Sequence, residues 1–209
     1  MRIGIDFDNT IAGYDTLFAT LAAERGLFQN APQDAPRSKR ALRDALRKRP
    51  EGELTWRRLQ AEAYGGRMTE AELLDGVDRF IRACGQSDLD VVIVSHKTRH
   101  ANFASDGTDL RQAAVNWMEA HGFFAADGLN LNLDDVYFEN TRAEKVDRIA
   151  ELDCDWFIDD LEEVFIEPRF PSSVRAILYD PHGQEEGTED FLRCRHWDEI
   201  GGHVLGPQH

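Results

Sequence analysis

The sequence is poor in cysteine and has no long apolar run. Its 209 residues include three widely spaced cysteines, Cys84, Cys154 and Cys194, an odd number that favours neither a disulfide framework nor a thiolate zinc site. No apolar run approaches the roughly 18 residues of a membrane-spanning helix, and Asp6 and Asp8 interrupt any secretory leader. We therefore expect a cytoplasmic, globular protein, built as one domain or as one domain with an insertion.

Positive charge is scarce as well. The chain has 39 acidic and 24 basic residues and a formal charge of -15. Such a field repels nucleic acid and anionic membranes, so we expect neither as a partner. However, 10 of the 24 basic residues lie within residues 37–67. That segment is either a surface that gathers anions or a solvated helix face.

Two glycine-rich motifs are missing. Neither G-x-x-x-x-G-K nor G-x-G-x-x-G occurs, so neither nucleotide triphosphate chemistry nor nicotinamide chemistry is supported. His96 and His100 have the spacing of two zinc ligands on a helix, but they follow the end of an expected strand, and no third soft ligand is nearby.

Strand-like and helix-like segments alternate along the chain. Short apolar runs predict buried strands near residues 3–5, 89–94, 136–138, 156–158 and 174–179. Apolar residues at helical spacing predict helices near 17–26, 38–48, 54–63, 69–85 and 110–122, and from Thr141 onward. Thr69 with Glu72 and Thr141 with Glu144 form capping-box patterns that would begin two of these helices. No strand is expected between about 12 and 86.

Acidic and hydroxyl side chains follow the ends of three predicted strands. Strands alternating with helices imply an α/β fold, a Rossmann-like parallel sheet covered on both faces. Ligands bind such sheets outside the carboxyl ends of the strands. Asp6 and Asp8, Ser95, and Asp159 and Asp160 all stand at such ends, so we expect them on one rim. Clustered carboxylates need a cation or a shared proton; the alternative is ordinary solvated turns.

This order of motifs resembles the haloacid dehalogenase (HAD) superfamily of phosphatases and related enzymes. The four signatures of that family are matched in order over roughly residues 1–12 and 87–180. They are Asp6, Asp8 and Thr10 of an Asp-x-Asp-x-Thr, then Ser95, then Lys145, then the pair Asp159 and Asp160. The resemblance implies a HAD-like core at 1–12 and 87–200, a helical cap at 13–86 and a tail at 201–209.

The resemblance also implies roles for the two aspartates of the first motif. Asp6 is the expected nucleophile, which forms an aspartyl-phosphate and divides one difficult step into two. Asp8 is the expected general acid for the leaving alcohol and later the base that activates water; alternatively it supplies only its backbone carbonyl to a metal. True dehalogenases lack an acid at this position, so Asp8 disfavours that activity.

A Mg²⁺ site is implied by the oxygen-rich set of ligands. Asp6 and Asp159 are its expected side-chain ligands, with the carbonyl of Asp8. Asp160 either binds the metal through water or holds Lys145 in place.

Further residues are expected to contact the substrate. Phosphate binding is assigned to Ser95, Lys145, Asn9 and Thr10. Possible contacts to the rest of the substrate are His96, Lys97, Tyr64 and Arg67.

The function implied is a Mg²⁺-dependent phosphomonoesterase acting on a small phosphate ester, such as a sugar phosphate or a nucleoside monophosphate. A phosphotransferase or phosphomutase of the same family would use the same residues. A non-catalytic regulatory protein that binds a phosphorylated ligand is the alternative from another class. Either a monomer or a homodimer is compatible with the sequence.

Overall fold

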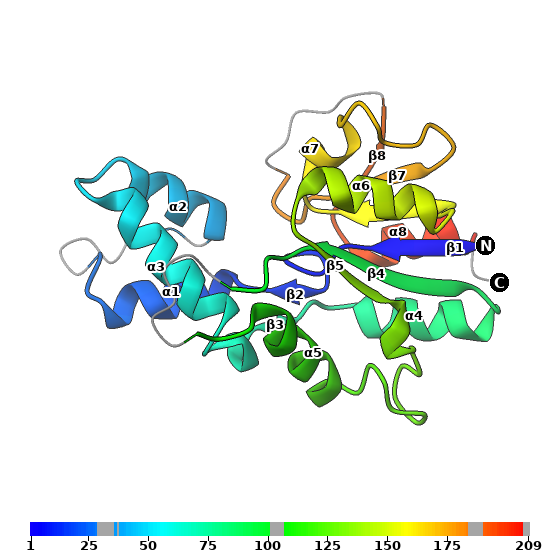
Figure 1. Cartoon of the computed structure of the whole chain (residues 1–209), viewed down its shortest axis with the longest axis horizontal. Coiled ribbons are helices and arrows are strands. Elements are labelled where there is room, and N and C mark those ends of the chain that lie inside the picture. The colour runs from blue at the N-terminus through cyan, green and yellow to red at the C-terminus, as the bar shows by residue number, and fades with distance from the viewer. Residues whose placement is uncertain (29–35, 37, 101–106, 184–189, 207–209) are drawn as a thin grey trace. The chain divides into compact units, whose positions relative to one another are not determined.

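The structure is a computed structural model that describes residues 1–28, 36, 38–100, 107–183 and 190–206. The chain divides into two compact units (Figure 1). Unit 1 comprises residues 1–12, 73–97 and 121–209, and unit 2 comprises residues 13–72 and 98–120. Among the described residues, no helix has both the length and the apolarity to cross a bilayer.

Unit 1 is built on a six-stranded sheet in the order β5-β4-β1-β6-β7-β8, and every neighbouring pair is parallel. The strands are β1 (Arg2–Ile5), β4 (Asp90–His96), β5 (Val136–Glu139), β6 (Trp156–Asp159), β7 (Arg175–Tyr179) and β8 (Leu192–Cys194). The chain adds strands first on one side of β1 and then on the other, which is the doubly wound order. The predicted α/β class with a Rossmann-like parallel sheet is confirmed.

Helices cover both faces of this sheet. They are α4 (Val77–Gln86), α6 (Arg142–Glu151), the single turn α7 (Glu162–Phe165) and α8 (Trp197–Val204), with a short 3₁₀ turn η3 at Leu133–Asp135. Figure 1 shows α6 on one side of the sheet and α4 on the other. Val146 of α6 packs in one core cluster with Val94 and Phe157. Gly4 permits this packing, because a Cβ there would lie 2.5 Å from the Phe157 ring.

Unit 2 is helical. It contains α1 (Asp15–Glu24), α2 (Lys39–Arg47), α3 (Gly52–Tyr64), the 3₁₀ turn η2 (Met68–Glu70) and α5 (Leu110–Ala120). Its core is aromatic: Phe18 stacks on Trp56 with ring centroids 4.8 Å apart, and Tyr14 meets Tyr64 edge-on at 4.8 Å. The buried indole of Trp117 donates a hydrogen bond to the carbonyl of Ala71 at 2.9 Å.

The helix expected at 69–85 begins later than predicted. Residues 68–70 form η2, and α4 begins at Val77, after Gly76 at a φ of 90°. The prediction of a capping box formed by Thr69 and Glu72 is therefore wrong. The prediction of no strand between about residues 12 and 86 is also wrong, because β2 (Ala12–Gly13) and β3 (Glu72–Leu73) pair as a two-stranded sheet.

The two units differ from the expected core and cap in two segments. Helix α4 was expected in the cap but belongs to unit 1, because its apolar face, which includes the buried Phe80 and Ile81, packs on β4 and α8. Residues 98–120 were expected in the core but belong to unit 2, where α5 packs against η2 and α3. The expected loose tail from residue 201 starts inside α8, which continues to Val204.

Candidate active site

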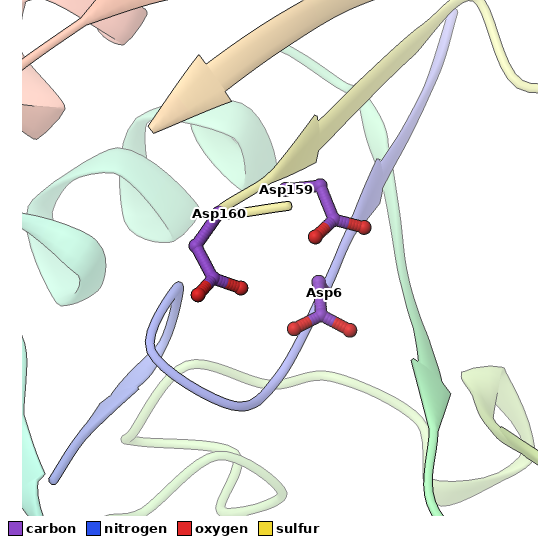
Figure 2. A group of neighbouring side chains, drawn as sticks. All are labelled: Asp6, Asp159 and Asp160. Atoms are coloured by element: carbon purple, nitrogen blue, oxygen red, sulfur yellow. The ribbon is translucent and has the colours of Figure 1, made fainter. Parts of the chain in front are cut away.

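Three aspartates meet where β1 and β6 end. Asp6 directly follows β1, and its backbone N–H donates to the carbonyl of Ile158 at 2.9 Å, which fixes it beside Asp159, the last residue of β6. One carboxylate oxygen from each of Asp6, Asp159 and Asp160 lies within 4.8 Å of the other two. Figure 2 shows the three side chains gathered beside the two strand ends. Asp6 and Asp159 are buried, and Asp160 is half-buried.

Lys145 lies against two of these carboxylates. The residue is in the first turns of α6, which begins with the predicted capping box: Thr141 accepts from the N–H of Glu144, and the Glu144 carboxylate accepts from the N–H of Thr141. The Lys145 ammonium is 2.5 Å from Oδ1 of Asp6 and 2.6 Å from Oδ2 of Asp159. The start of α6 thus places the buried ammonium of Lys145 against the carboxylates at the ends of β1 and β6.

Burial and charge act in opposite directions on this group. Burial alone lowers the pKa of Lys145, but the carboxylates of Asp159 and Asp6 outweigh it and raise the pKa above its usual value. Burial raises the pKa of the Asp159 carboxyl, against the opposing charge of Lys145, and the nearby Asp6 raises it further. The site therefore holds a protonated lysine and a carboxyl that binds a proton more readily than an ordinary aspartate.

Asp8 has a different ammonium partner. Lys97, which follows β4 and is buried, places its Nζ 2.8 Å from Oδ2 and 3.0 Å from Oδ1 of Asp8. The two aspartates of the first motif are thus separated: Asp6 faces Lys145, and Asp8 faces Lys97.

Asn9 contacts the acidic cluster through its side chain. It has a left-handed φ of 62°, a conformation that asparagine tolerates better than most residues. Its Nδ2 donates to Oδ2 of Asp160 at 3.2 Å. Asn9 was expected to bind phosphate and Asp160 either to bind the metal or to hold Lys145. The structure places Asn9 against Asp160, and Lys145 against Asp6 and Asp159.

Two buried hydroxyls lack hydrogen-bond partners within the described part of the chain. These are the side chains of Ser95, in β4, and Thr10, in the turn after β1. A buried hydroxyl without a partner is unfavourable by roughly 1–3 kcal/mol. Both were predicted to bind phosphate, and both are donors that a ligand oxygen or a water could satisfy.

The four predicted contacts to the rest of the substrate are divided between the units. His96, in unit 1, is exposed, and its Nε2 lies 3.0 Å from the carbonyl of Asn140. Lys97 faces Asp8. In unit 2, Tyr64 packs against Tyr14, and Arg67 forms ion pairs with Glu70 and Glu24.

The basic segment of unit 2 carries its own acidic partners. Arg47 and Arg57 both pair with Glu53, at 2.7 Å and 3.0 Å. Exposed pairs of this kind fit the interpretation of a solvated helix face.

The acidic cluster suits Mg²⁺. All of its ligands are carboxylate oxygens, which hard divalent cations prefer. Lys145 contacts one oxygen of Asp6 and one of Asp159, and its single positive charge is smaller than the charge that the three carboxylates carry when all are ionised, which a bound cation would offset. Asp6, Asp159 and Asp160 would therefore hold the metal.

One buried carboxylate near this edge was not predicted from the sequence. Asp180 directly follows β7 and is buried in an ion pair with Arg193 of β8, at 3.1 Å. The signal was present in the sequence, because Asp180 stands at the carboxyl end of a predicted strand, as Asp159 does.

Comparisons with known proteins identify the fold. No protein-family model matches the chain, and a search of curated proteins gives no significant match. Solved structures match it over nearly its full length. One is a HAD-superfamily hydrolase from Ehrlichia chaffeensis, 12% identical, with a TM-score of 0.57 over 98% of this chain and 95% of that chain.

Two further matches were solved with bound ions. The HAD-hydrolase YfnB from Bacillus subtilis, bound to magnesium, is 14% identical, with a TM-score of 0.56 over 99% of this chain and 98% of that chain. A HAD family hydrolase from Deinococcus radiodurans, with bound phosphate and sodium, is 12% identical, with a TM-score of 0.54 over 98% and 94%. At such low identity the similarity concerns the fold. The chain therefore has the α/β fold of the HAD-superfamily hydrolases.

Proposed function

We propose that the chain is a Mg²⁺-dependent phosphatase that hydrolyses a small phosphate monoester through a phosphorylated Asp6. The observation that carries this proposal is the buried contact of Asp6 with Lys145 inside a cluster of three carboxylates. A carboxylate at a strand end, next to one cation and a site for another, suits attack on an anionic phosphate ester. The similarity to a magnesium-bound and a phosphate-bound HAD hydrolase supports the same reading.

Each step can be assigned to residues of this site. A carboxylate oxygen of Asp6 forms a bond to phosphorus while the bond from phosphorus to the leaving oxygen breaks. Asp8 gives its proton to that oxygen, and the alcohol departs. Water then attacks the phosphorus of the aspartyl-phosphate and gives a proton to Asp8, which releases phosphate and restores Asp6.

The neighbouring groups stabilise charge in both steps. Lys145 offsets the charge of Asp6 and of the phosphoryl group, and the hydroxyl of Ser95 donates to a phosphoryl oxygen. Mg²⁺ bound by the three carboxylates would supply further positive charge to the phosphoryl oxygens. Unit 2, which shares residues 13–72 with the cap that the family resemblance implies, is proposed as the cap of the enzyme.

The test is release of phosphate from an aryl phosphate by the full chain with Mg²⁺. We expect turnover that disappears with a chelator and returns with added Mg²⁺. Asp6→Asn should abolish turnover, because an amide cannot form the phosphoryl intermediate. Asp147→Asn is the matched control, since Asp147 is on α6 but its side chain is 43% exposed. Absence of Mg²⁺-dependent activity across a broad panel of phosphate esters would contradict the proposal.

A further inference from the structure

Lys97 is a buried lysine whose ammonium is held in place from several sides. Its backbone N–H donates to the carbonyl of Glu139, the last residue of β5, at 2.9 Å. Its Nζ lies 5.5 Å from the centroid of the buried Phe7 ring and contacts both carboxylate oxygens of Asp8. The side chain is only 3% exposed. Lysines are rarely buried in this way unless they are paired.

The contact with both oxygens constrains the Asp8 carboxylate. The backbone of Asp8 is already fixed by a tight turn, in which the N–H groups of Ile11 and Ala12 both donate to the carbonyl of Phe7 at 3.0 Å. The side chain can still rotate about its own bonds. An ammonium that contacts both oxygens selects one orientation of the carboxylate.

Lys97 and Lys145 serve different carboxylates. The contacts of Lys145 are with Asp6 and Asp159, at 2.5 Å and 2.6 Å. Lys97 therefore supplies the second buried cation of the site, directed at the residue assigned to proton transfer rather than at the nucleophile. A substrate contact, which the sequence suggested for Lys97, does not explain why the ammonium spans both oxygens of Asp8.

We propose that Lys97 is a positioning residue, whose ammonium holds the Asp8 carboxyl group in the orientation from which it transfers protons to the leaving oxygen and from water. The inference rests on the proposed function, because it assigns Lys97 a role in the same reaction. If Lys97 acts through Asp8, its removal should slow departure of the leaving group. The loss of rate should be larger for a leaving group that needs a proton more.

The experiment compares two esters with different leaving groups. Phenyl phosphate releases a basic oxygen that needs a proton, whereas 2,4-dinitrophenyl phosphate releases a stable anion. For Lys97→Met we expect kcat/KM, which reports the step in which the leaving group departs, to fall about 10- to 100-fold with phenyl phosphate, because part of the roughly 10²- to 10⁴-fold contribution of acid catalysis is lost. With the dinitrophenyl ester kcat/KM should change little. Lys97→Arg should recover part of the loss. Lys48→Met is the control, since Lys48 is exposed and lies in unit 2.

A kinetic double-mutant cycle separates positioning from direct contact with substrate. If Lys97 acts through Asp8, adding Lys97→Met to Asp8→Asn should cause little further loss, whereas two independent contacts give losses that multiply. An equal loss of kcat/KM with both esters, or multiplying losses in the cycle, would overturn the proposal. Circular dichroism of each variant verifies that it is folded.

Failure of the proposed function has a different signature. A wild-type protein that hydrolyses neither ester with Mg²⁺ contradicts the phosphatase assignment itself, and the positioning role fails with it. The ion pair remains testable in that case through urea unfolding of Lys97→Met, Asp8→Asn and the double variant. A coupling free energy of zero between the two positions would show that the contact of Lys97 with Asp8 does not form.

Discussion

Each aspartate of the first motif contacts a different buried lysine. Asp6 and Asp8 are two residues apart, yet Asp6 contacts Lys145 from α6 and Asp8 contacts Lys97 from the end of β4. The charge of Lys145 lies against the proposed nucleophile, whereas the contacts of Lys97 fix the orientation of the proposed proton donor. The different partners fit the different roles that the family resemblance implies.

Removing Lys145 should have a larger effect than removing Lys97. In Lys145→Met, Asp6 and Asp159 would remain buried beside each other without the ammonium. We expect hydrolysis to fall by about 100-fold or more, and the free energy of unfolding without Mg²⁺ to fall by about 3 kcal/mol. Steady-state kinetics and urea unfolding measure the two effects. An unchanged urea midpoint would show that Lys145 does not neutralise the cluster.

Side-chain partners were the part of the site that sequence could not supply. The sequence predicted that Asp6, Ser95 and Asp159 share one rim of the sheet, because the carboxyl ends of parallel strands lie at the same edge. That prediction needs only the position of each strand. The contacts of Asn9 with Asp160 and of Lys97 with Asp8 depend on turn geometry and side-chain rotamers. Neither leaves a periodic signal in the sequence.

Helices and strands were predictable where their apolar residues are long runs or strongly periodic. The runs at β4 and β6 and the start of α6 match the prediction. The failure at α4 has a local cause: Glu72 of the predicted capping box is itself the first residue of the two-residue strand β3, and Gly76 redirects the chain before the helix begins. Strand β8 was missed because it has three residues, too few to show alternation.

The two capping-box patterns form a matched pair for experiment. Thr141 caps α6, and that cap sets the first turns that carry Lys145. We expect Thr141→Ala to lower the free energy of unfolding by about 1 kcal/mol, and to reduce kcat as the helix start frays. Thr69→Ala should change stability by less than about 0.5 kcal/mol, because Thr69 is exposed and caps no helix. Urea unfolding of both variants measures the difference, and equal effects would contradict the assigned caps.

The order of the strands explains where the site lies in the sheet. Strand β1 lies between β4 and β6, where the direction of strand addition reverses, and ligands bind at such a point. The acidic cluster lies where β1 and β6 end. The strongly negative chain thus concentrates several carboxylates at one edge of unit 1, where a bound cation would stabilise the folded state.

Mg²⁺ should therefore stabilise the protein, and by more at higher pH. Burial raises the pKa of Asp159 in the folded state above its value in the unfolded state. Without metal, the contribution of Asp159 to stability therefore falls as the pH rises from the unfolded-state pKa to the folded-state pKa. Mg²⁺ requires the ionised carboxylate and competes with that proton. Added Mg²⁺ should then raise the melting temperature more at about pH 8 than at about pH 5.

Thermal unfolding with and without Mg²⁺, at both pH values, measures this effect without any substrate. In Asp159→Asn the amide cannot ionise, so the increment from Mg²⁺ should be small and should vary less with pH. Asp147→Asn should respond to Mg²⁺ as the wild type does, because Asp147 pairs with Arg169 and is not one of the three clustered carboxylates. If Mg²⁺ stabilised the wild type equally at both pH values, proton competition at Asp159 would be excluded. If it stabilised Asp159→Asn as strongly as the wild type, the metal would bind elsewhere on the chain.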